Sequence, residues 1–398
     1  MAKNTHLEHL EDDILNNGSA GGKASIAFLR SLGQMLSQGD KNNIKVTTKW
    51  DGAPAIVCGT LPGSDQFFVG NKSVFAKTTP KVCFSPSIID VFYPESGLNP
   101  VLKSCLKYLS ELNIKGVIQG DLLFTENTKS ITDVNGQRCV VFTPNTITYA
   151  IPINTEIGKR VLKSKIGIVF HTTYNGTSLD TMSAGFGVDV SSYQGNPNVA
   201  VFSSDFTDTS GSANFTTAEL TKFKSTVNMA EGSLRQASKF LDVMKGTDKF
   251  AFNTVFKQFF NAYIRKGTTI PSTNKVLTDF ASYYNTILDK EINSKKSAKG
   301  KEKWTDVKNN GLKFISANQR SIYMTVASYK NLTTAKLMII RKLEKVKGIG
   351  TFLKDGNGYK VTAPEGFVAI KSGSALKLVD RLEFSVANFT TDKNWDTK

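Results

Sequence analysis

The chain has 398 residues, 40% of them hydrophobic and 21% charged, so it is long enough for two or three domains with a substantial core. No stretch approaches the roughly 18 consecutive apolar residues of a membrane span. The four cysteines form no C-x-x-C pair, which excludes zinc-finger spacing and favours a reducing compartment. We therefore expect a cytoplasmic protein, in the host cytoplasm if the chain is viral, with no membrane partner.

The charge of the chain is unevenly distributed. Lysine and arginine number 50 against 34 aspartate and glutamate, a net charge of +16. Residues 215–347 alone hold 25 basic and 10 acidic residues, a difference of +15. An excess of this size usually indicates a polyanionic partner. The asymmetry predicts a near-neutral body that carries a basic attachment for nucleic acid.

The hydrophobic pattern changes period along the chain. Residues 5–37 indicate two helices broken at the run NNGSAGG, and β-type runs separated by Gly, Pro and Asp follow. From about residue 215 apolar residues recur three or four apart, which predicts helices, and β-type sequence returns after residue 350. We expect an α+β fold, an antiparallel-sheet domain interrupted by a basic all-α insertion. The expected parts are an N-terminal helical segment (1–40), the sheet domain (41–214 and 348–398) and the insertion (215–347).

The N-terminal residues contain two runs that only partly match known binding motifs. The run HLEHLEDD could hold a metal through His6 and His9, but an amphipathic helix with Leu7 and Leu10 inward is favoured. The run NNGSAGGKAS (16–25) lacks the first Gly and the Ser/Thr of a phosphate loop. A turn between helices is the favoured interpretation of this second run.

The stretch VTTKWDGAPAIVCG (46–59) places Lys49 directly after a β-type run and two residues before Asp51-Gly52. An Asp-Gly hairpin turn beside a solvated lysine is one interpretation. The other is a nucleophilic lysine that the strand end presents to a pocket. A lysine amine needs desolvation or a cationic neighbour to become a good nucleophile. The pattern K-x-D-G alone leaves both interpretations open.

Four further runs follow in order along the chain. IQGDLLFT places Asp121 on a strand after a glycine, and KIGIVFHTTY is an apolar strand that contains Phe170 and His171. PEGFVAIKSG offers Glu365 at the start of a strand, and ALKLVDR offers Lys377 a short hairpin later. Each of these residues is ordinary by itself.

Together, and in this order, the runs resemble the nucleotidyltransferase motifs of ATP-dependent polynucleotide ligases and mRNA capping enzymes, and are closest to phage-type RNA ligases. The resemblance implies that Lys49 attacks the α-phosphate of ATP, that Lys377 contacts that phosphate and that Phe170 stacks on the base. It also implies Mg²⁺ or Mn²⁺ as the metal, since carboxylates and phosphate oxygens suit these ions. The implied nucleotide-binding residues are Thr48, Asp51, Gly52, Lys72, Asp121, Phe170 and Lys371, and the implied metal ligands are Asp51, Asp121 and Glu365.

The chain departs from the family pattern at three places. Ala53–Ala55 replace an arginine that often follows the lysine motif, Asp121 is shorter than the usual Glu, and Val379 occupies the place of a second lysine. Only 17 residues follow Arg381, which leaves no room for the OB-type domain of DNA ligases and capping enzymes. This feature favours an RNA ligase.

The leading prediction is an ATP-dependent RNA ligase that seals 5′-phosphate to 3′-hydroxyl ends through a lysyl-AMP intermediate. One alternative is a DNA nick ligase with a helical insertion in place of an OB domain. The other is a non-catalytic nucleic-acid-binding protein on a nucleotidyltransferase scaffold. In each case a lysine run, interpreted as a solvated loop, would contact backbone phosphates. Its residues are Lys295, Lys296, Lys299, Lys301 and Lys303.

Overall fold

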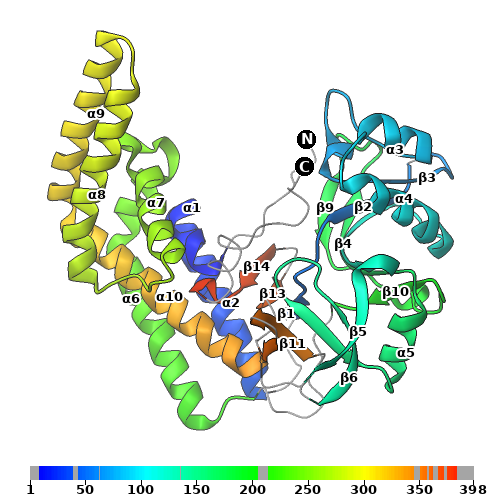
Figure 1. Ribbon diagram of the computed structural model, residues 1–398. Coiled ribbons are helices and arrows are strands. Elements are labelled where there is room, and N and C mark those ends of the chain that lie inside the picture. Colours follow the sequence, from blue (N-terminus) through cyan, green and yellow to red (C-terminus); the bar gives the residue numbers. More distant parts are fainter. Residues whose placement is uncertain are drawn as a thin grey trace.

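The computed structural model describes most of the chain, with gaps. The described residues are 9–38, 44–61, 63–134, 136–204, 214–344, 350–355, 358–361, 366–371 and 374–382. Figure 1 shows two lobes: long helices form one, and most of the strands form the other. Mixed helices and mainly antiparallel sheets make this an α+β protein, as predicted.

The helices range in length from a single turn to more than eight turns. The N-terminal helices follow a 3₁₀ turn at Leu10–Asp12 and are α1 (Asp13–Asn16) and α2 (Gly18–Gln38). The helical lobe contains α6 (Thr217–Thr247), α7 (Phe252–Arg265), α8 (Thr273–Ser294), α9 (Ala298–Ala317) and α10 (Gln319–Leu343). Three shorter helices accompany the strands: α3 (Pro86–Phe92), α4 (Leu98–Leu109) and α5 (Glu156–Lys163).

The described strands form three sheets. One has the order β10-β8-β4-β2-β3 with β9 on β8, the second β12-β11-β7-β6-β5, and the third β1-β13-β14. All pairs are antiparallel except β8 with β10. The strands are β1 (Ile44–Lys49), β2 (Ala55–Thr60), β3 (Phe67–Gly70), β4 (Val117–Thr125), β5 (Lys129–Val134), β6 (Gln137–Phe142), β7 (Thr148–Pro152), β8 (Ile166–Asn175), β9 (Ser183–Phe186), β10 (Val199–Phe202), β11 (Gly350–Asp355), β12 (Gly358–Val361), β13 (Gly366–Lys371) and β14 (Ser374–Leu378).

One face of the three-stranded sheet packs against the helices. Val46 of β1, Phe367 of β13 and Leu378 of β14 are buried in the same core as the apolar faces of α2, α6 and α10. Burial of apolar surface is the main force that joins such layers. The residues expected to form a separate N-terminal segment therefore share one core with the helical lobe. The smallest sheet and the helices form one packed body.

The predicted break within NNGSAGG (16–22) is confirmed, but only the start of the run forms it. The helix interruption lies at Asn17, and the glycines that follow lie inside α2. A side chain at Gly21 would come within 2.1 Å of the Asp13 carbonyl oxygen, and one at Gly22 within 2.6 Å of Leu234 on α6. These glycines allow close packing of α2 against α1 and α6. Their function is close approach and not a turn.

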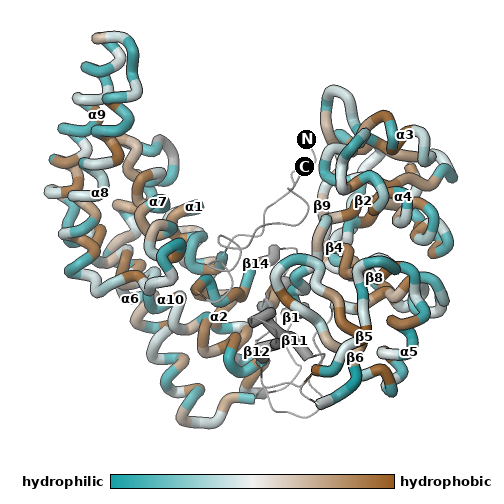
Figure 2. Tube along the Cα trace, viewed as in Figure 1, coloured by the Kyte–Doolittle hydropathy of each residue, from teal (hydrophilic) through white to brown (hydrophobic). Residues whose placement is uncertain are grey.

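The lysine run near residue 300, predicted to be a loop, is only partly one: Lys295 and Lys296 lie in the connection between α8 and α9. Lys299, Lys301 and Lys303 lie in the first turns of α9, and Ser297 caps that helix by accepting a hydrogen bond from the Gly300 backbone N–H. In Figure 2 the lobe helices alternate hydrophobic and hydrophilic stretches, as helices with one buried face do. None of the helices in the described ranges is long and apolar enough to cross a membrane.

Candidate active site

A small cavity of about 100 Å³ lies where the three-stranded sheet meets the six-stranded sheet. Lys49 at the end of β1 and Val368 of β13 line one side of it. Asp121 of β4 and His171 of β8 line the other side. Residues far apart in the sequence therefore line one cavity.

Strand register places Lys377 on the same face of its sheet as Lys49. In the antiparallel pairs, Lys49 lies opposite Gly366 on β13, and Lys377 lies opposite Val368. Residues directly opposite each other, and residues two apart, share a face of a sheet. Both lysines are half-buried, and the other face of the sheet packs into the helical core. The two lysines thus flank β13 on the cavity side.

Gly366, in the predicted metal-binding motif, has a conformational reason to be glycine. Its φ is +150°, and a Cβ there would lie 2.4 Å from the carbonyl oxygen of Leu378. Only glycine fits this position without a shift of β14. The neighbouring Glu365, predicted as a metal ligand, lies outside the described residues. The backbone of Lys371 closes the β13–β14 hairpin, and its side chain likewise lies outside the description.

Asp51 anchors the lysine-bearing turn. Its buried carboxylate accepts hydrogen bonds from the Asn145 side-chain amide at 2.8 Å and from the backbone N–H groups of Thr146 and Ile147, both at 2.7 Å. Its own N–H donates to the Tyr149 hydroxyl at 2.7 Å. Both carboxylate oxygens are engaged inside the protein, so these contacts do not fit the predicted metal-ligand role. They hold the chain directly after Lys49 in a fixed position.

The glycine of the lysine motif, Gly52, allows the turn to approach β4. A Cβ at Gly52 would lie 2.5 Å from the Cβ of Asp121. The Ala53 N–H donates to the Leu122 carbonyl at 2.9 Å, which ties the turn to the same strand. The K-x-D-G turn and the Gly120-Asp121-Leu122 segment of β4 are therefore in direct contact. Gly52 allows this close approach but does not itself line the cavity.

Asp121 is paired with a histidine at the cavity. The Asp121 Oδ1 atom lies 3.4 Å from His171 Nε2, and the two side chains are 23% and 33% exposed. The other ring nitrogen of His171 is 2.8 Å from the Thr172 hydroxyl. Asp121 thus presents a partly accessible carboxylate whose position a neighbouring imidazole helps to set.

Phe170 does not line the cavity, so its position does not fit the predicted stacking role. Its side chain is fully buried (0% exposed) in the core on the other face of β8, where it packs edge-on against Tyr193. Val169 and His171, its sequence neighbours, line the cavity instead. A phenylalanine that does line the cavity is Phe186 on β9, which pairs with β8. The short run SAGF carries no sequence signal for this role.

Backbone groups and a tryptophan complete the cavity. The Thr48 N–H donates to the Ser204 carbonyl at 2.6 Å, and both residues line the cavity. Trp50 also lines it, and its ring packs against Tyr149 and Phe202, both at 5.0 Å between ring centroids. The sequence analysis missed Trp50, Phe186 and Ser204. Trp50 could have been found, because it lies directly beside Lys49 in the motif.

Lys72 lies near the motif end of the sheet but does not line the cavity. It is exposed in a 3₁₀ turn that follows β3. Gly70 pairs with Val57, near the start of β2. The chain therefore leaves β3 at the same end of the sheet at which the lysine-motif turn enters β2. Among the described residues no cluster of three or more His, Cys, Asp or Glu is suited to a metal ion.

The predicted nucleic-acid contacts lie at the turn between α8 and α9. Lys296, Lys299, Lys301 and Lys303 are exposed there, whereas Lys295 pairs with Glu291 at 2.5 Å. Figure 1 shows this turn at the end of the helical lobe that points away from the sheets. These lysines and the cavity therefore occupy different parts of the molecule.

Fold and site together define an α+β protein with a lysine- and aspartate-lined cavity between two antiparallel sheets and a basic helical lobe. The sequence matches the model of a family over residues 4–393, nearly the whole chain, and the protein belongs to it: "Family of unknown function (DUF6267)". Comparison with curated proteins and with solved structures gave no match.

Proposed function

We propose that this protein is an ATP-dependent RNA ligase in which Lys49 is the nucleophile. One observation carries the proposal. The lysine of K-x-D-G and the aspartate of G-D-L, far apart in the sequence and on different sheets, line one cavity. Lys377 lies on the same face of its sheet as Lys49. Cations beside a nucleophile are the groups that a phosphoryl transfer requires.

The reaction would proceed in three transfers. The neutral Nζ of Lys49 attacks the α-phosphorus of ATP, a P–N bond forms, the bond to the β-phosphate oxygen breaks, and pyrophosphate leaves as the amine proton passes to solvent. A 5′-phosphate oxygen then displaces Lys49 and takes the AMP. A 3′-hydroxyl finally attacks the 5′-phosphorus, loses its proton and releases AMP. Lys377 would neutralise charge that develops on the phosphates.

The cavity suggests how the remaining ligands would be held. Asp121 presents a partly exposed carboxylate, and magnesium sites often combine one or two carboxylates with phosphate oxygens. Phe186 offers a ring face for the base. RNA would contact the helical lobe, where the positive charge of the chain is concentrated.

A labelling assay tests the proposal. The parent, Lys49→Ala and the exposed control Lys115→Ala are incubated with α-labelled ATP and Mg²⁺, denatured and examined for acid-labile label. We expect label on the parent and on the Lys115 variant and none on the Lys49 variant. Equal label on all three proteins would place the nucleophile elsewhere. A parent that takes no label from ATP or GTP would refute nucleotidyl transfer.

One observation favours a second candidate, a non-catalytic nucleic-acid-binding protein. Val379, at the place of the second motif lysine, is 3% exposed and packs in the core with Trp50 and Phe202. An apolar core residue there cannot contact phosphate. Salt-dependent RNA binding that survives Lys49→Ala, without any adenylate, would favour this candidate. Nicked duplex DNA that outcompetes RNA as a substrate would instead favour a DNA ligase.

A further inference from the structure

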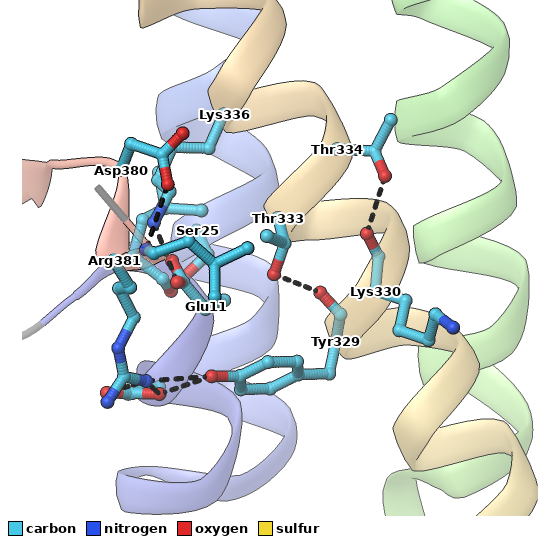
Figure 3. Close-up of polar contacts among 12 residues, drawn as sticks. Glu11, Ser25, Tyr329, Lys330, Thr333, Thr334, Lys336, Asp380 and Arg381 are labelled. Carbon is cyan, nitrogen blue, oxygen red and sulfur yellow. Dashed lines mark hydrogen bonds and ion pairs between the residues drawn. The ribbon is translucent and has the colours of Figure 1, made fainter. Parts of the chain in front are cut away.

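A buried ion pair joins the N-terminal residues to the helical lobe. Lys336 Nζ on α10 lies 2.6 Å from Glu11 Oε1, and both side chains are 1% exposed (Figure 3). Glu11 belongs to the 3₁₀ turn before α1. Charged side chains are almost never buried this completely unless they are paired. The pair fixes the start of the described chain against the middle of the long helix α10.

Arg381, four residues after Lys377, forms a second set of contacts at the same place. Its Nη1 donates to both oxygens of Asp12, at 2.9 and 3.1 Å, and to the Tyr329 hydroxyl at 3.0 Å. Its Nη2 donates to the Asn261 side chain at 2.7 Å. One guanidinium thus links the N-terminal turn, α7 and α10, and only an arginine has this planar fork of donors.

His9 connects these contacts to Lys49 and Lys377. Its backbone forms a bridge with Lys377 on β14. Burial lowers the pKa of its imidazole, and so do the positive charges of Lys336, Arg381, Lys377 and Lys49, in that order. The side chain therefore stays neutral and lies within electrostatic reach of both Lys49 and Lys377. We call His9, Glu11, Asp12, Tyr329, Lys336 and Arg381 the buried junction.

The contacts of the buried junction fix the position of its residues more than they stabilise the fold. Within the described part of the chain, His9 Nδ1, Glu11 Oε2 and Arg381 Nε are buried without a hydrogen-bond partner. Such atoms cost free energy, and a buried ion pair is often no more stabilising than an apolar pair of the same volume. Burial also raises the pKa of the Asp12 carboxyl, which Arg381 opposes. What the junction achieves is a fixed position for the end of β14.

We propose that the buried junction positions Lys377 to contact the α-phosphate of ATP, with Arg381 and the Glu11–Lys336 pair as positioning residues. This inference rests on the proposed nucleotidyl transfer and extends it. The strand that carries Lys377 is held by α10, so the rate of transfer to Lys49 depends on a helix of the basic lobe. The helical lobe then contributes to the chemical step as well as to binding.

The test uses an apolar replacement that keeps the fold. In the full chain, Glu11→Leu/Lys336→Met removes the pair without leaving one charge unpaired. Lys342→Met is the matched control, since Lys342 is also a buried lysine of α10 paired with a glutamate, Glu219 at 2.6 Å. Lysyl-AMP formation is measured at varied ATP, together with the melting temperature. We expect the double variant to lose at least tenfold in rate at saturating ATP, with KM and melting temperature little changed.

Three results would overturn the inference. If the double variant forms lysyl-AMP at the parental rate, the Glu11–Lys336 pair has only a structural role. Rates that fall only in proportion to melting temperature, equally in the double variant and in Lys342→Met, would have the same meaning. A parent that forms no adduct would refute the proposed function itself, and this differs from the other two results because the control is silent as well. Arg381→Lys, which keeps the charge and loses the fork, should show the same loss of rate as the double variant.

Discussion

Val169, Phe170 and His171 are consecutive in β8 and face different environments. The first and third line the cavity, and the second is buried in the core on the other side. Successive side chains of a strand point to opposite faces, so an assignment that is off by one residue selects the wrong face. Phe186 lines the cavity from the neighbouring strand, and in the proposed function its ring would stack on the base.

Substitution of the two phenylalanines should therefore have different effects. Phe186→Ala should raise the KM for ATP roughly 5- to 150-fold, since base–aromatic stacking is worth about 1–3 kcal/mol, and should leave the melting temperature nearly unchanged. Phe170→Ala should lower the free energy of unfolding by about 3–5 kcal/mol, because it opens a cavity in the core. Adenylation kinetics and chemical denaturation distinguish them. The reverse pattern would return the stacking role to Phe170.

At the scale of elements, the start of α6 is tied to the end of α10. Thr216 and Glu219 form a capping box, in which each side chain accepts from the backbone N–H of the other. Lys342 also contacts Glu219 at 2.6 Å. These contacts lower the pKa of Glu219 to about 2, with the Lys342 hydrogen bond as the largest cause. The ionised form of this glutamate thus favours the folded state.

The stabilisation from Glu219 should depend on pH in a defined window. Its carboxyl is more acidic in the folded than in the unfolded chain, so the stabilisation is complete above about pH 5 and is lost as the pH falls from about 4.5 towards 2. The difference in melting temperature between the parent and Glu219→Gln should shrink over that range. Glu302→Gln, exposed on α9, is the control. A difference that is constant with pH would contradict the assignment.

Local pattern predicted the types of most elements, and tertiary contacts decided the rest. The helical period after residue 215 and the alternation around Lys49 correspond to helices and strands in the structure. Gly21 and Gly22 were assigned to the break between helices, because the contacts that require glycine there, with Asp13 and Leu234, lie outside the run. Asp51 was assigned to a metal because its partners lie in a loop around residue 146 that the motif does not include.

At the scale of the whole molecule, the cavity lies between two sheets whose main cores differ. Lys49 and Lys377 belong to a sheet whose other face lies in the helical core, whereas Asp121, His171 and Phe186 belong to the six-stranded sheet. The resemblance put Lys49 and Asp121 in one predicted site, and both line this cavity. Nothing in the sequence indicated that the N-terminal turn reaches Lys377, because one backbone bridge and buried charges make that connection.

The exposed lysines of the α8–α9 turn should contribute to RNA affinity and not to adenylation. Changing Lys296, Lys299, Lys301 and Lys303 to Gln should weaken RNA binding and reduce the dependence of log affinity on log salt by up to about 3, since each neutralised phosphate contributes about 0.7. The label on Lys49 should be unchanged. Lys77→Gln/Lys115→Gln, exposed in the sheet lobe, is the control. An unchanged salt dependence would exclude this turn from the RNA interface.

The α8–α9 hairpin also sets a length for its partner. The 22 residues of α8 span about 33 Å at 1.5 Å per residue. Its start lies near α10, since Lys330 donates to the Pro271 carbonyl at 2.6 Å, and its far end carries the lysines. A partner that contacts both α10 beside Lys330 and the lysines of the tip must therefore span about 33 Å.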